Sequence, residues 1–221
     1  MVADKFGIAG ILFFSAISLF LYMRPFLTHY STFYAFVILL ATSIIGMKVL
    51  NGSILYFPGI IGYSFIFYLL LGVKDFSLVK RSRLYYIAAL LLFYSIFIEF
   101  FLADKSELFL LKYGMVIVAA FFLFREWLII IKVFSFPKRE LIVSAVAAFL
   151  LAQVLWAAAL LPIGFISASN FMLLFVFVAA DFLVQHFLGG ISKEFLIQRF
   201  VFFALVSALI FWTSNWSLRM F

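Results

Sequence analysis

Long, largely uncharged hydrophobic stretches alternate with short polar segments along the chain. A helix of about 20 residues, rising 1.5 Å per residue, crosses a hydrocarbon core about 30 Å thick. The stretches do not alternate apolar and polar residues as barrel strands do. The pattern predicts an all-α, polytopic transmembrane helical bundle of about eight spans, at residues 6–23, 32–50, 53–72, 84–103, 108–132, 140–161, 168–188 and 196–214.

Helix-breaking and charged residues separate these stretches, at 24–25, 51–53, 80–83, 104–107, 137–139, 162–164 and 189–190. The fifth stretch is ambiguous because it contains Arg125 and Glu126. It is either one long helix or a shorter helix ending near Phe124 and followed by an interfacial one. The first stretch is interpreted as a retained helix and not a signal peptide, because its start lacks a net basic charge.

The amino-acid composition indicates that the outer surface of the helical bundle faces lipid. Hydrophobic residues make up 68% of the chain and charged residues 11%, whereas a water-facing surface needs roughly a quarter or more charged residues. The net charge of +7 comes from basic residues at the ends of apolar stretches, with no stripe of interleaved aromatics, so nucleic acid is not an expected partner. The expected partner is the bilayer. Because the chain has no cysteine, disulfides and thiolate ligands are excluded.

The basic residues divide unequally between the two sides that eight spans would create. The odd-numbered connections hold ten, namely Arg24, Lys74, Lys80, Arg81, Arg83, Lys132, Lys138, Arg139, Lys193 and Arg199. The other side holds five, namely Lys5, Lys48, Lys105, Lys112 and Arg219. By the positive-inside rule, the richer side is predicted to be cytoplasmic and both termini to be outside.

The basic cluster Lys74, Lys80, Arg81 and Arg83 has two interpretations. It is a stop-transfer group, which is the favoured interpretation, or a patch that binds anionic lipid headgroups or a partner on the cytoplasmic side.

Two features bear on how the helices are arranged. Shifting the chain by about half its length aligns several loops, which raises the hypothesis of two four-helix repeats, residues 1–105 and 106–221, within a single membrane domain. Chance similarity of turn-like loops is the favoured alternative. Small residues every four positions, Ser144, Ala148 and Ala152, predict close packing that would make the sixth span central.

Ionisable side chains within the spans mark the positions where function could lie, because each costs at least about 2.5 kcal/mol near the bilayer centre. One group combines Asp181, Gln185 and His186 on the seventh span with Arg125 and Glu126 on the fifth. Its two interpretations are a polar site open to the cytoplasm and a structural ion pair between Arg125 and Asp181. Glu99, near the outer end of the fourth span, is expected to reach the headgroups.

The sequence carries no familiar enzymatic pattern. The chain has only two histidines, His29 and His186, and neither a glycine-rich phosphate loop nor a framed nucleophile. No catalytic, metal or cofactor site is therefore predicted, and enzymatic activity stays open but disfavoured.

Three functions remain at this point. A small-solute or ion permease or channel-like protein ranks first, followed by a non-catalytic membrane subunit or scaffold that packs against a partner or a second copy. A lipid-modifying enzyme ranks a distant third. A water-accessible cavity at Asp181 and Arg125 would favour the permease, and a solid bundle would favour the subunit.

Overall fold

The computed structural model describes residues 8–23, 32–50, 53–75, 81–103, 109–131, 137–188 and 190–214. Within these ranges the chain forms helices and no strand. The helices are α1 (Ile8–Met23), α2 (Phe33–Val49), α3 (Tyr56–Asp75), α4 (Arg81–Leu102), α5 (Phe109–Ile131), α6 (Pro137–Leu160), α7 (Phe165–Leu188) and α8 (Lys193–Thr213). The prediction of an all-α bundle of eight helices is confirmed.

The length and surface of the helices are those of a multi-pass integral membrane protein. Six helices, α3 to α8, are long and apolar enough to cross a membrane, while α1 and α2 are shorter apolar helices of 16 and 17 residues. Large apolar side chains such as Phe65, Phe149 and Phe200 are exposed on the outside of the bundle. Lipid is the solvent that such a surface requires.

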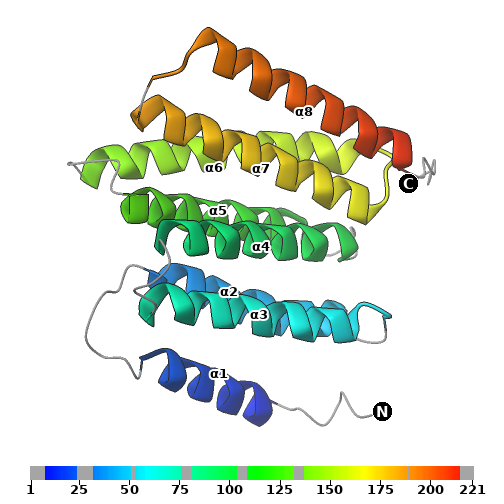
Figure 1. Ribbon diagram of the computed structural model, residues 1–221. Helices are drawn as coiled ribbons and strands as arrows, with labels where there is room; N and C mark the ends of the chain where they lie inside the picture. The colour runs from blue at the N-terminus through cyan, green and yellow to red at the C-terminus, as the bar shows by residue number, and fades with distance from the viewer. Residues whose placement is uncertain are drawn as a thin grey trace.

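Consecutive helices run antiparallel and stack in layers (Figure 1). The helix α1 lies at one edge of the stack and α8 at the other, with α2 and α3, α4 and α5, and α6 and α7 between them. The first residue of α1 and the last of α8 lie at the same end of the bundle. The predicted cytoplasmic position of the basic connections stays a prediction, as does the division into two repeats.

The centre of the bundle is α4, which packs against α2, α3, α5 and α7. Its buried side chains include Tyr85, Leu92 and Phe97. The expectation that α6 is central is wrong. The small residues of α6, including Ser144 and Ala148, are indeed buried, but the opposite face of this helix is exposed, because α6 packs only against α5 and α7 among the main helix contacts.

The helix bounds settle the ambiguity at the fifth stretch. Helix α5 is one uninterrupted helix through Arg125 and Glu126. The helices α4, α6, α7 and α8 begin at residues 81, 137, 165 and 193, each three residues before the predicted 84, 140, 168 and 196. For α4, α6 and α8, the hydrophobic pattern missed these first turns because a helix at a membrane surface can begin with charged or proline residues. Helix α7 begins with Phe165, Ile166 and Ser167, directly after the turn at residues 162–164.

Candidate functional site

Glu126 is a carboxylate on α5 that is only 2% exposed. Its Oε1 accepts a hydrogen bond from the backbone N–H of Tyr34 at 2.6 Å. Its Oε2 accepts hydrogen bonds from the backbone N–H of Ala35 and the hydroxyl of Tyr85, both at 2.9 Å. Because Tyr34 and Ala35 belong to the first turn of α2, Glu126 acts as an N-terminal cap supplied by another helix.

The ordinary capping residue of α2 is used elsewhere. Thr32 makes no side-chain hydrogen bond to the first turn, and its hydroxyl instead lies 2.6 Å from that of Tyr22 on α1. The ring of Tyr22 stacks on Phe36 with centroids 4.0 Å apart. Glu126 therefore substitutes for Thr32 and places the oxygen atoms of its carboxyl group at the positive end of the helix dipole.

Arg125 lies beside this cap and does not reach Asp181. Its guanidinium carbon is 5.9 Å from the ring centroid of Tyr34. Its buried Nε has no hydrogen-bond partner within the part of the chain that the structure describes.

The structure pairs Asp181 with a different arginine from the one expected. Arg199 on α8 approaches the carboxylate at 2.9 Å, and the two side chains are 25% and 34% exposed for Asp181 and Arg199 respectively. The guanidinium of Arg199 also lies 5.5 Å from the ring centroid of Phe195. The pairing follows from helix order, because α8 packs directly on α7 along the face that carries Asp181.

The other predicted members do not join Asp181. Gln185 donates from Nε2 to the carbonyl of Gly190 at 3.3 Å, and His186 is exposed. Gly190 has φ of 77°, a left-handed conformation that favours glycine in the short turn before α8. The five residues predicted to form one polar site are thus divided between the α2 cap, the α7–α8 contact and the turn between α7 and α8.

The structure describes three of the four residues of the basic cluster Lys74, Lys80, Arg81 and Arg83. Lys74 and Arg81 belong to the ends of α3 and α4, and Arg83 is exposed on the first turn of α4. Lys80 lies outside the described residues. Binding of anionic lipid by this cluster stays a prediction.

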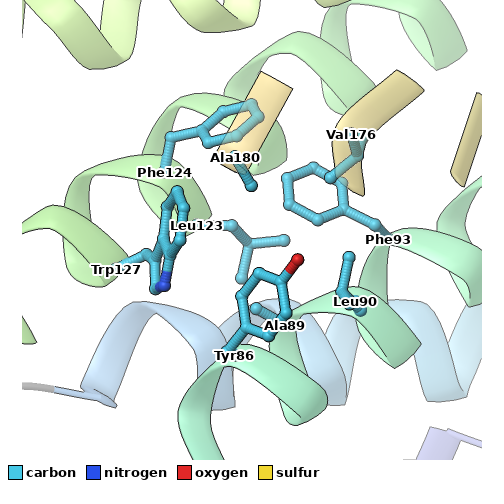
Figure 2. Close-up of a pocket in the computed structure, with 9 residues that line it drawn as sticks. All are labelled: Tyr86, Ala89, Leu90, Phe93, Leu123, Phe124, Trp127, Val176 and Ala180. Carbon is cyan, nitrogen blue, oxygen red and sulfur yellow. The ribbon is translucent and has the colours of Figure 1, made fainter. Parts of the chain in front are cut away.

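A small cavity of about 10 Å³ lies between α4, α5 and α7. The side chains that line it are hydrophobic apart from the hydroxyl of Tyr86 and the indole N–H of Trp127. The lining residues are Tyr86, Ala89, Leu90, Phe93, Leu123, Phe124, Trp127, Val176 and Ala180. The hydroxyl of Tyr86 points toward the middle of this group (Figure 2) and has no hydrogen-bond partner among the described residues. The space is at the lower limit for one water molecule, and neither Asp181 nor Arg125 lines it.

Glu99 on α4 occupies a different environment from the headgroup position expected for it. The residue is 7% exposed, and its Oε1 accepts a hydrogen bond from the hydroxyl of Tyr63 on α3. Within the described ranges, the ion pair between Asp181 and Arg199 is the one present, so Glu99 has no cationic partner there.

Gly46 on α2 makes the contact between Glu99 and Tyr63 possible. An ideal Cβ built on Gly46 would lie 2.7 Å from Oε1 of Glu99 and would overlap the Tyr63 hydroxyl. Only glycine leaves room for both side chains at this point, so three helices converge on one carboxylate. We call Glu99, Tyr63 and Gly46 the Glu99 cluster.

A sequence signal for the Glu99 cluster existed. Tyr85, Leu92 and Glu99 are spaced seven residues apart, which places them on one face of a helix. In the structure the first two are fully buried, which shows that this face points inward. The spacing alone places Glu99 with them but does not show which face of the helix is buried.

Metal-ligand geometry and comparison with known proteins give no further indication of function. Among the described residues there is no group of three or more histidine, cysteine or acidic side chains that could hold a metal ion. No family model, curated protein or solved structure matches the chain.

The first prediction concerns the α2 cap. Glu126→Gln removes one acceptor oxygen and places an amide donor against the donors of Tyr34, Ala35 and Tyr85, so the free energy of unfolding in detergent should fall by about 1–3 kcal/mol. Amide hydrogens at the start of α2 should also exchange faster. Glu140→Gln, the same chemical change in the first turn of α6, is the control and should stay within about 0.5 kcal/mol of wild type. Equal loss in both variants would refute the capping role.

A second prediction separates the observed ion pair from the expected one. In a double-mutant cycle with Asp181→Ala and Arg199→Ala, the coupling energy should be about 0.5–3 kcal/mol, because the two side chains interact directly. The cycle of Asp181→Ala with Arg125→Ala should be additive within about 0.5 kcal/mol. Coupling of Asp181 to Arg125 but not to Arg199, measured by unfolding in detergent, would contradict the pairing.

Proposed function

We propose that this chain is a small-solute or ion permease whose ion-responsive group is Glu99. The observation that supports the proposal is the burial of this carboxylate in the bundle with Tyr63 as its hydrogen-bond partner and no cation paired to it within the described residues. Intramembrane ionisable groups are rare because of their cost, and those that persist commonly mark ion and substrate pathways.

Comparison with the other two intramembrane carboxylates singles out Glu99. Glu126 accepts three hydrogen bonds, two of them from the end of a helix. Asp181 faces Arg199 across the contact between α7 and α8. Both are compensated and serve to hold helices together, whereas Glu99 has one neutral hydroxyl as its partner. A group of this kind can change its charge without dismantling a salt bridge.

The position of Glu99 also suits a coupling role. Gly46, Tyr63 and Glu99 bring α2, α3 and α4 into contact at one point, and α4 is the helix on which the bundle is built. A change of charge at Glu99 would therefore act directly on the packing of three helices. Transport requires such a link between an ion site and helix packing.

A membrane subunit without transport activity is the second candidate. It is favoured by the cavity between α4, α5 and α7, which is small and hydrophobic and is not lined by Asp181 or Arg125. The peripheral helix α8, with exposed Phe200, Leu205 and Trp212, offers a face that lipid or another membrane protein could cover.

Proton movement in proteoliposomes tests the permease proposal. Acid-loaded vesicles containing the purified protein and a pH-sensitive dye are exposed in turn to NaCl, KCl, a mixture of amino acids and a mixture of sugars. At least one addition should drive proton movement in wild type, and Glu99→Gln should slow it by about tenfold or more, since the amide cannot ionise.

Glu140→Gln is again the matched control and should retain the wild-type rate. Proton movement no faster than in empty vesicles for every addition would contradict the permease and favour the subunit. Equal rates in wild type and Glu99→Gln would remove Glu99 from the mechanism.

A further inference from the structure

We infer that the ion bound at the Glu99 cluster is a proton and not a metal cation. This inference deepens the proposed function and rests on it for its biological role. Three observations support the choice of a proton: the number of oxygen atoms around Glu99, the space left beside them and the charges on the neighbouring helices.

The oxygen atoms at the cluster are too few to coordinate a metal cation. Glu99 contributes its carboxylate and Tyr63 a hydroxyl, which donates its hydrogen to Oε1. Hard cations such as Ca²⁺ and Mg²⁺ take six or more oxygen ligands at defined distances. Intramembrane Na⁺ sites gain theirs from unwound backbone, but α2, α3 and α4 are helical at this level. The carbonyls of Gly46 and Glu99 themselves accept from the N–H groups of Leu50 and Ala103.

The space beside Glu99 is closed on the side of α2. Even one additional carbon at Gly46 would lie 2.7 Å from Oε1 and would overlap Tyr63. A hydrated cation, or a cation with water ligands completing its shell, is far larger than a methyl group. A proton needs no such space, because it forms a bond to one carboxylate oxygen.

Among the described residues, no cationic side chain is paired with Glu99. At its end of the bundle, α3 presents Tyr63, α2 carries the exposed Lys48 and α5 carries the half-buried Lys112 and Tyr113. None of these lysines forms an ion pair with Glu99. Residues 165–176 of α7 contain no titratable side chain, and the titratable neighbour on α4 itself is Tyr94. An ionised carboxylate here would be an uncompensated charge of the kind that the bilayer disfavours most.

The chemical step is a simple protonation. The carboxylate of Glu99 takes one proton from a hydronium ion and becomes the neutral acid; one O–H bond forms at the carboxylate, one O–H bond of hydronium breaks, and a water molecule is left. Because Oε1 already accepts from the Tyr63 hydroxyl, the proton is carried by Oε2. Release reverses the step and returns one negative charge to the contact between α2, α3 and α4.

Infrared spectroscopy of the reconstituted protein tests this assignment directly. The carbonyl-stretch region reports protonated carboxylic acids. Wild type should show a band there at neutral pH that is lost in Glu99→Gln, retained in Glu140→Gln and shifted to higher frequency in Tyr63→Phe, which removes one hydrogen bond. The Tyr63→Phe shift keeps the test decisive if Glu99→Gln does not fold.

Other outcomes would overturn the inference. An unchanged acid band in both Glu99→Gln and Tyr63→Phe would show that Glu99 is ionised. Loss of the wild-type band on addition of NaCl, KCl or CaCl₂ at constant pH would show that a cation replaces the proton.

These results separate the two proposals. A Glu99 acid band without any solute-driven proton movement would leave the proton site standing and refute the permease. Solute-driven proton movement with an ionised Glu99 would do the reverse.

Discussion

Glu126 satisfies the constraint on which the rest of this bundle depends, which is that polar groups inside a lipid bilayer must find their partners within the chain. The first turn of a helix leaves backbone N–H groups unpaired, and at α2 these are met by a carboxylate from α5. The same carboxylate accepts from Tyr85 on α4. One side chain thus fixes the relative positions of three helices. Because Thr32 does not cap α2, its hydroxyl is able to form a hydrogen bond with that of Tyr22, which links α1 to the start of α2.

The face of α4 that begins with Tyr85 continues through Leu92 to Glu99, so the central helix carries a structural contact near one end and the Glu99 cluster near the other. The three intramembrane carboxylates differ in how they are compensated. Glu126 has helix-terminal donors, Asp181 has Arg199, and Glu99 has one neutral hydroxyl. This difference is the reason for proposing a structural role for the first two and a functional role for the third. It follows from the principle that a buried charge is retained either by its partners or for its function.

The sequence predicted the architecture well, because hydrophobic length alone determines where helices can cross a bilayer. It did not predict the contacts. Arg125 and Asp181 lie at similar positions along their helices. Because of the rotation of each helix about its axis, however, Arg125 faces Tyr34, and Asp181 forms an ion pair with Arg199. Hydrophobicity contains little information about that rotation, since all faces of a membrane helix are apolar. The seven-residue spacing placed Glu99 on one face of α4 with Tyr85 and Leu92, but the sequence did not show that this face points inward, and the proximity of Glu99 to Gly46 depends on tertiary packing.

Transient currents on a solid-supported membrane test the central claim, that Glu99 is a proton-binding group inside a membrane bundle, most directly. Proteoliposomes adsorbed on the sensor receive a rapid pH jump with no solute gradient, so the current reports only charge that enters the protein. Wild type and Glu140→Gln should give a transient current whose sign reverses with the direction of the jump, and Glu99→Gln should give none. A current of wild-type size from correctly folded Glu99→Gln would contradict the account.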